Sequence, residues 1–185
     1  RVPRYANPNS LGQSFNFDLL EADFNADQFR TIITDNLELA SSSGSSSTWV
    51  LSNHDVVRHA TRYGLPDAVR THGPRPDKPV GQDWLLTGGT EPELHREQGL
   101  RRARAATMLM LALPGSSYIY QGEELGLHEV AEIPADQRQD PTFFRTNQKE
   151  IGRDGCRVPL PWVHDAANFG FGGPAHLPQP SWFAD

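Results

Sequence analysis

The pattern of apolar and polar positions divides the chain into alternating short apolar runs and longer helical periods. Residues 14–20 alternate partly and contain two phenylalanines, which predicts a short strand. In residues 26–39 apolar side chains recur at helical spacing, and Asn25 before them could be the N-cap, which predicts a helix. Residues 48–52 form a second apolar run and predict the next strand.

The second half of the chain continues this alternation after an interruption. Residues 64–92 are dominated by Pro, Gly and Asp, which predicts an irregular excursion. Residues 92–113 predict a long helix that Pro114 and Gly115 stop, and residues 117–120 predict a third strand. This order of elements predicts βαβ units and a parallel sheet, whose strand ends are the usual place for a site.

Composition narrows the function classes. The chain has 185 residues, enough for a sizeable core, and its net charge of −6 argues against a nucleic-acid-binding protein. No apolar run approaches the length of a membrane span. Cys156 is the single cysteine, and the histidines lack metal-ligand spacing, so we expect no internal disulfide and no metal site.

The predicted strand 48–52 ends in an unusual polar sequence, Ser-Asn-His-Asp, with Arg58 three residues beyond Asp55. A carboxylate at this position can accept two hydroxyl groups or stabilise positive charge, His54 can donate a hydrogen bond, and an arginine can fix the carboxylate. The alternative is purely structural: these side chains cap backbone donors, and Arg58 pairs with Asp55.

Two further stretches carry polar side chains after apolar runs. Glu123 and Glu124 follow the third predicted strand, where they could be an acid/base pair, or one could cap the next turn and orient the loop. Residues 152–162 place two arginines and an Asp around a glycine turn, followed by Pro-x-Pro-Trp, which indicates a rigid loop with an aromatic anchor. Cys156 in this loop is interpreted as a buried structural thiol.

In this order, the stretches resemble the α-amylase family of retaining glycoside hydrolases, and most closely its α-glucosidase and oligo-1,6-glucosidase branch. FNFDLL resembles the segment at the sixth barrel strand, LSNHDVVR that at the end of the seventh, and GSSYIYQGEELGL that at the eighth, although the family often has Pro where Ser117 stands. RDGCRVPLPW resembles a loop that follows the last strand in the α-glucosidase branch.

The resemblance implies an α/β fold that is a partial (β/α)₈ TIM barrel, roughly strands 6 to 8 with their helices and loops. Residues 1–165 would be the C-terminal portion of the catalytic barrel, and residues 166–185 a loop leading towards a C-terminal β-sandwich outside this chain. The family's nucleophile lies in a Gly-x-Arg-x-Asp stretch and its general acid on the next strand, and neither stretch occurs here. We therefore expect part of an α-glucosidase that is inactive alone.

The resemblance also implies the roles of individual residues. Asp55 would be the catalytic carboxylate that grips the sugar in the cleavage subsite and stabilises the transition state, and His54 would hydrogen-bond the same sugar. Arg58 and Arg157 would line the substrate pocket, with Arg153 a near competitor for the second place. Glu124 would be structural support.

The substrate would be an α-linked gluco-oligosaccharide, and no cofactor is implied, because carboxylates and water suffice for the chemistry. Two alternatives stay open: an α-glucan transglycosidase or isomerase of the trehalose synthase type, and a non-catalytic carbohydrate-binding homologue. No signal peptide is visible, so we expect a cytoplasmic enzyme, with any targeting segment outside a chain that begins Arg-Val-Pro.

Overall fold

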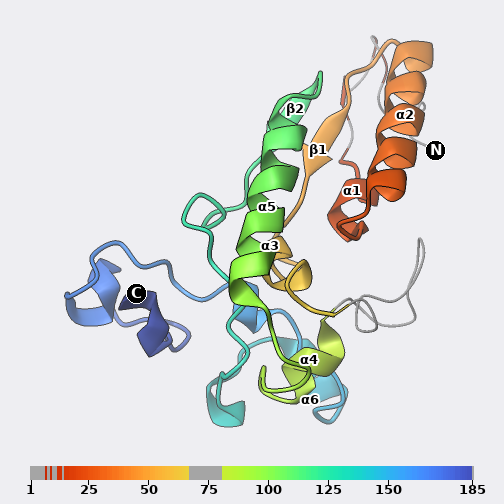
Figure 1. Cartoon of the computed structure of the whole chain (residues 1–185). Coiled ribbons are helices and arrows are strands. Elements are labelled where there is room, and N and C mark those ends of the chain that lie inside the picture. Colours follow the sequence, from red (N-terminus) through yellow and green to blue (C-terminus); the bar gives the residue numbers. More distant parts are fainter. Residues whose placement is uncertain (1–6, 8, 10–11, 14, 67–80, 185) are drawn as a thin grey trace.

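The structure is a computed structural model that describes residues 7, 9, 12–13, 15–66 and 81–184 (Figure 1). Its helices and strands, in chain order, are α1 (Asp18–Glu21), α2 (Ala26–Ser43), β1 (Thr48–Val50), α3 (His59–Arg62), α4 (Gln82–Leu86), α5 (Arg96–Leu111), β2 (Ser116–Tyr118) and α6 (Pro141–Arg145). Short 3₁₀ turns lie before α6 at Ala135–Gln137 and after it at Asp154–Cys156, Ala167–Gly170 and Ser181–Ala184. The first part of the chain is therefore regular, and the part after β2 consists mainly of loops.

The two strands form a parallel pair. Thr48 lies opposite Ser116 and Val50 opposite Tyr118, while α3, α4 and α5 come between the strands in the chain. A parallel pair needs such a crossover connection. The predicted βαβ unit and parallel sheet are confirmed for these two strands.

Helix α2 begins where its capping residue predicts. The Asn25 side chain accepts hydrogen bonds from the backbone N–H groups of Asp27 and Gln28, both at 3.0 Å, which satisfies two donors at the helix start. The helix runs to Ser43, four residues beyond the predicted end, and stops at Gly44 in the left-handed conformation. The first three residues of the Ser- and Gly-rich stretch 41–47 are therefore helical.

The predicted strand over residues 14–20 is wrong in the described part, residues 15–20. Asn16 Oδ1 accepts a hydrogen bond from the N–H of Asp18 at 2.8 Å, and the helical turn α1 begins there. Both Phe15 and Phe17 are exposed, so the alternation does not separate a buried face from a solvent face. This local side-chain hydrogen bond favours the turn, and the sheet that the structure describes, β1 with β2, does not include these residues.

Helix α5 begins at Arg96, later than the predicted residue 92. The backbone N–H of His95 donates to Gly64 O at 3.1 Å, so the preceding chain pairs with the end of α3 instead of coiling. Gly99 permits the close approach of these helices, because a Cβ there would lie 2.2 Å from Ala60 O. The expected excursion over residues 64–92 lies partly outside the described residues, and its last part contains α4.

The main core forms around β1, where α2 and α5 pack (Figure 1). Trp49 and Leu51 are fully buried there with residues from four helices, namely Leu19, Phe29, Ala60, Ala103, Ala106 and Met110. A second cluster packs α4 against Phe143 of α6, and a third packs Leu177 and Phe183 onto Val130 and Val158. Within the described ranges, no helix is both long and apolar enough to cross a membrane.

Candidate active site

The polar loop that follows β1 is fixed from both sides. Asn53 Oδ1 accepts a hydrogen bond from the N–H of Asp55 at 2.8 Å. Beneath the loop, the buried guanidinium of Arg62 donates to the carbonyl oxygens of Leu51 at 2.7 Å and Val57 at 3.0 Å. The loop therefore presents Asp55 from a preorganised backbone, as a functional carboxylate requires.

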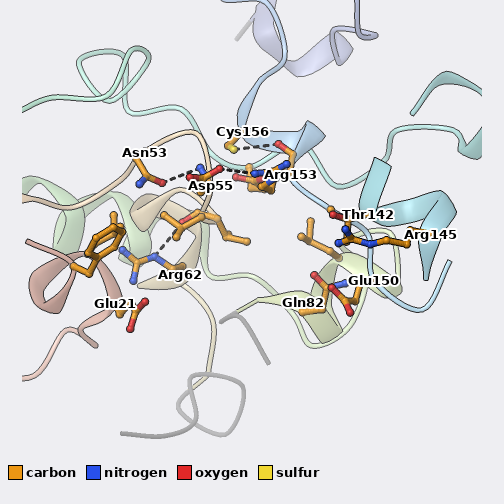
Figure 2. A pocket seen from close by; sticks show the side chains of 17 residues that line it. Glu21, Asn53, Asp55, Arg62, Gln82, Thr142, Arg145, Glu150, Arg153 and Cys156 are labelled. Carbon is orange, nitrogen blue, oxygen red and sulfur yellow. Dashed lines mark hydrogen bonds and ion pairs between the residues drawn. The ribbon is translucent and has the colours of Figure 1, made fainter. Parts of the chain in front are cut away.

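Asp55 is held by two arginines from a distant part of the chain. Its Oδ1 accepts a hydrogen bond from Arg153 Nη1 at 2.8 Å (Figure 2). The same oxygen accepts a second hydrogen bond from Arg157 Nη2 at 3.2 Å. His54 Nε2 lies 3.5 Å from the other oxygen, Oδ2. The Asp55 side chain is still 44% exposed, so the carboxylate is oriented by charge-assisted hydrogen bonds and remains accessible to a ligand.

A cavity of about 690 Å³ adjoins this carboxylate, a size typical of small-molecule sites. Asp55 and Arg153 line it side by side (Figure 2). Its other polar lining residues include Glu21, Arg62, Gln82, Thr142, Arg145 and Glu150. A wall that combines carboxylates, guanidinium groups, an amide and a hydroxyl is chemically suited to a polar ligand with several hydroxyl groups.

The structure brings three of the four sequence-predicted site residues together. Arg157 Nε donates to the backbone oxygen of His54 at 2.8 Å, and the same guanidinium reaches Asp55. The His54 side chain is 66% exposed beside Asp55. His54 and Arg157 contact Asp55, which lines the cavity, but they are not themselves lining residues.

Arg58 is the predicted site residue that the structure does not bring to Asp55. Its guanidinium is buried and donates to the carbonyl oxygens of Gln121 at 2.9 Å and Cys156 at 3.1 Å. It also lies over the ring of Tyr120, 5.0 Å from the ring centre. The structural alternative in which Arg58 pairs with Asp55 is wrong, and the role of Arg58 in the substrate pocket stays a prediction.

The two adjacent glutamates after β2 have different environments. Glu124 Oε2 accepts a hydrogen bond from the N–H of Gly122 at 2.8 Å, which confirms that this residue caps the turn. The Glu123 side chain is buried, and burial raises its pKa to about 7. His59 Nδ1 lies 3.7 Å away, and burial together with the charges of Arg62 and Arg58 lowers the pKa of His59 to about 3. Between these values both groups are neutral, and neither lines the cavity.

The pKa of Glu123 predicts a pH-dependent stability. The folded protein binds this proton more tightly than the unfolded chain, whose pKa is 4.5, so the stabilisation present below pH 4.5 is lost as pH rises through about 7. The Glu123→Gln variant should not lose this stabilisation. Its free energy of unfolding relative to that of wild type should therefore rise by about 2 kcal/mol between pH 5 and pH 7.5. Urea midpoints of the complete protein at both pH values measure this difference.

Glu124→Gln is the matched control, because it makes the same change at the neighbouring exposed carboxylate. We expect the stability of the Glu124→Gln variant relative to wild type to show no comparable rise with pH. A Glu123→Gln difference that is constant from pH 5 to 7.5 would contradict the buried-carboxyl interpretation. The lowered pKa of His59 acts in the opposite direction, because it makes stability rise with pH between about 3 and 6.5 in both proteins and cancels from the comparison.

The loop over residues 152–162 is tied to the rest of the chain by hydrogen bonds of Arg153 and Arg157, but the expected aromatic anchor is wrong, because Trp162 is 70% exposed. Cys156 is a buried free thiol whose Sγ contacts Arg153 O at 3.1 Å, and burial raises its pKa, so the structural interpretation is confirmed. Among the residues that the structure describes, no three His, Cys, Asp or Glu side chains are grouped to hold a metal ion.

Sequence reasoning missed two buried carboxylates: Glu129, which lines the cavity, and Asp140, which does not. Asp140 Oδ2 accepts from Arg153 Nε at 2.7 Å, and Glu129 Oε2 accepts from the backbone N–H of Arg58 at 2.9 Å. An Asp directly before Pro141 signals a helix start. The sequence around Asp140 or Glu129 gives no sign that either residue contacts the site. The family resemblance favours Arg157 over Arg153 as the second arginine of the site. In the structure both contact Asp55, and Arg153 makes the shorter contact.

Comparison with known proteins places this chain in a family. Residues 90–184 match the family model described as alpha amylase, catalytic domain. A probable alpha-glucosidase of Rhizobium meliloti (strain 1021) is 34% identical over 114 residues, which are 62% of this chain and 15% of that protein. An oligo-1,6-glucosidase of Saccharomyces cerevisiae (strain ATCC 204508 / S288c) is 27% identical over 157 residues, 74% of this chain and 21% of that protein.

Among solved structures, an alpha-glucosyl transfer enzyme, XgtA, matches 99% of this chain with a TM-score of 0.65 and 28% identity. The match covers 28% of that protein, so this chain spans between 15 and 28% of the length of the three relatives. The family match covers more than half of this chain and includes β2 and the loop that carries Arg153 and Arg157. The chain therefore belongs to the alpha-amylase family of glycoside hydrolases, in the branch of the α-glucosidases and oligo-1,6-glucosidases.

Proposed function

We propose that this chain is the part of a retaining α-glucosidase that carries the transition-state carboxylate, Asp55. On this proposal β1 and β2 are the seventh and eighth strands of a (β/α)₈ barrel, and the site lies at the carboxyl ends of these strands. The complete enzyme releases glucose from the end of short α-linked oligosaccharides. The nucleophile and the general acid come from sequence outside these 185 residues.

The observation that carries this proposal is the half-exposed Asp55 carboxylate, held through Oδ1 by Arg153 and Arg157 at the end of β1. A carboxylate fixed on one oxygen can use the other to accept sugar hydroxyls, and its charge favours the oxocarbenium-like transition state. His54 lies beside it with an exposed ring and would hydrogen-bond the same sugar. Arg157 would hold Asp55 from outside the cavity lining, and a contact of Arg58 with the sugar is part of the proposal that rests on the family resemblance alone.

A second candidate function is transfer of the glucosyl group to another sugar. The structural match to an alpha-glucosyl transfer enzyme favours it, because that match spans almost the whole chain. Hydrolysis and transfer share the donor site and differ in whether water or a sugar attacks the intermediate. Product analysis with maltose separates them: an α-glucosidase yields glucose alone at low substrate concentration, whereas a transferase yields trisaccharides.

The assay that tests the proposal is release of p-nitrophenol from p-nitrophenyl α-glucoside, and of glucose from maltose, by the complete enzyme. Turnover of either substrate supports the α-glucosidase. If the folded enzyme turns over neither but binds maltose in calorimetry, a non-catalytic carbohydrate-binding homologue replaces the proposal.

The 185-residue chain alone should release no detectable p-nitrophenol. Retaining hydrolysis needs two carboxylates about 5 Å apart, a nucleophile and an acid, and Asp55 fills neither role. The measurement compares the purified chain with the complete enzyme at equal molar concentration. Turnover by the chain that persists after further purification and is lost in its Asp55→Asn variant would show that these residues contain a full catalytic set.

A further inference from the structure

Behind the arginine pair, two buried aspartates link two loops of the chain. Asp140 Oδ2 accepts hydrogen bonds from Arg153 Nε at 2.7 Å and from the Arg153 backbone N–H at 2.9 Å. In return, Asp154 Oδ2 accepts from the backbone N–H groups of Gln139 at 2.8 Å and Asp140 at 3.0 Å. Each loop thus supplies a carboxylate to the other, and Arg153 stands at the junction.

The Arg153 guanidinium spans two carboxylates with different atoms. Nε contacts Asp140, whose side chain is fully buried, and Nη1 contacts Asp55, which is 44% exposed. The planar fork of an arginine can make both contacts in one fixed orientation, whereas the point charge of a lysine cannot. The inner contact therefore determines where the outer edge of the guanidinium lies.

Asp140 stays ionised in this buried position. Burial alone would raise the pKa of its carboxyl, but hydrogen bonds from Arg153 and Thr142 hold that pKa well below its usual range. The backbone is also adapted to this contact: Gly152 has φ +80°, and a Cβ there would lie 2.9 Å from both Cβ and Cγ of Asp140. A buried charge is costly unless it is fully paired, and here its pairing partner is the arginine that holds Asp55.

We infer that Asp140 is a positioning residue of the active site, which acts through Arg153 to hold the Asp55 carboxylate in its productive orientation. The inference rests on the proposed function, since it gives Asp140 a part in the reaction that Asp55 serves. Asp140 does not line the cavity and lies behind the arginine (Figure 2 shows Arg153 between Asp55 and the α6 side of the cavity).

The test uses Asp140→Asn in the complete enzyme with p-nitrophenyl α-glucoside. The amide keeps Oδ1, which caps α6 through the N–H of Thr142 at 2.9 Å, but it places an NH₂ group against the Arg153 donors. We expect kcat to fall about 10- to 100-fold with KM within about threefold, as for a misplaced catalytic group. Asp136→Asn, an exposed aspartate of the same segment, is the matched control and should match wild type.

A double-mutant cycle separates positioning from general support of the fold. In an Arg153→Lys background, Asp140→Asn should lower kcat less than about twofold further, because the bridge is already lost. Losses that multiply in the double variant, or a kcat of Asp140→Asn within twofold of wild type, overturn the inference. Arg153→Lys retains a cation beside Asp140, so the cycle does not depend on a variant with an unpaired buried charge.

A crystal structure of the Asp140→Asn enzyme gives a readout that does not need activity. We expect the Arg153 guanidinium to leave Asp55 while α6 and the backbone of residues 152–157 stay in place. An Arg153 that still contacts Asp55 in that structure overturns the inference. If wild type turns over no α-glucoside, the proposed function fails, and the position of Arg153 in the variant still decides whether Asp140 holds it.

Discussion

Asp55→Asn in the complete enzyme should lower kcat/KM for p-nitrophenyl α-glucoside and for maltose by about 100- to 1,000-fold, as expected when a preorganised transition-state group is removed. The amide has nearly the same shape, but it is neutral and presents only one acceptor oxygen. Arg153 and Arg157 then face a group that cannot balance their charge. The loss should appear mainly in kcat, because the charge of the carboxylate matters most when positive charge develops on the sugar ring.

Folding of the variant is checked by circular dichroism and thermal melting, which should match wild type because Asp55 is half-exposed. The chain offers a close control in Asp165→Asn: His164 and Asp165 repeat the His-Asp sequence, with Nδ1 and Oδ1 3.7 Å apart, at an exposed position. That variant should keep full activity. An Asp55→Asn enzyme that is folded and retains more than about a tenth of wild-type kcat/KM would exclude Asp55 from the transition state.

Local signals in the sequence predict much of the regular structure. The Asn25 cap and the helical repeat of Phe29, Ile32 and Ile33 define α2, and the apolar runs define β1 and β2. The failure at residues 14–20 has a local cause too, because the Asn16 side chain caps a helical turn that periodicity does not reveal. Capping and turn chemistry compete with alternation over such short segments.

The site itself was only partly predictable, because its parts meet across long sequence separations. Asp55 and His54 were visible as polar residues at a strand end, but Asp55 and Arg153 are 98 positions apart, and no periodicity relates them. The family resemblance predicted that the 152–162 loop lies at the site. Only the structure shows that both Arg153 and Arg157 contact Asp55 and that Arg153 makes the shorter contact. Asp140 could be predicted as a helix cap and not as a partner of Arg153.

Arg58 shows why sequence distance is a poor guide to side-chain direction. It lies three residues beyond Asp55, yet the loop between them turns its guanidinium into the protein, over the ring of Tyr120. Alternation along a strand specifies faces only while the strand continues, and β1 ends at Val50. The direction of Arg58 is determined by the two carbonyl oxygens that it satisfies, Gln121 and Cys156.

Arg58→Ala should therefore destabilise the complete enzyme by about 3–5 kcal/mol, as for loss of one partner from a buried charged network. The carbonyl oxygens of Gln121 and Cys156 lose their donors, and the buried Glu129, whose pKa burial raises to about 7, loses a nearby positive charge. Urea or thermal denaturation at pH 7 measures the change. Arg30→Ala is the control, because Arg30 is exposed and pairs with the exposed Asp27, so its loss should cost less than about 1 kcal/mol.

Arg58→Lys then separates a structural role from a role in substrate binding. A lysine can replace one of the two carbonyl contacts and keeps the charge near Glu129, so we expect an intermediate loss of stability, with KM for maltose unchanged when the variant is assayed below its melting temperature. A raised KM with an unchanged melting temperature would instead mean that Arg58 reaches the sugar, as the family resemblance implies. An Arg58→Ala protein as stable as the Arg30→Ala control would show that the guanidinium does not support the loops between Tyr120 and Cys156, and the contacts that place it there would then carry little free energy.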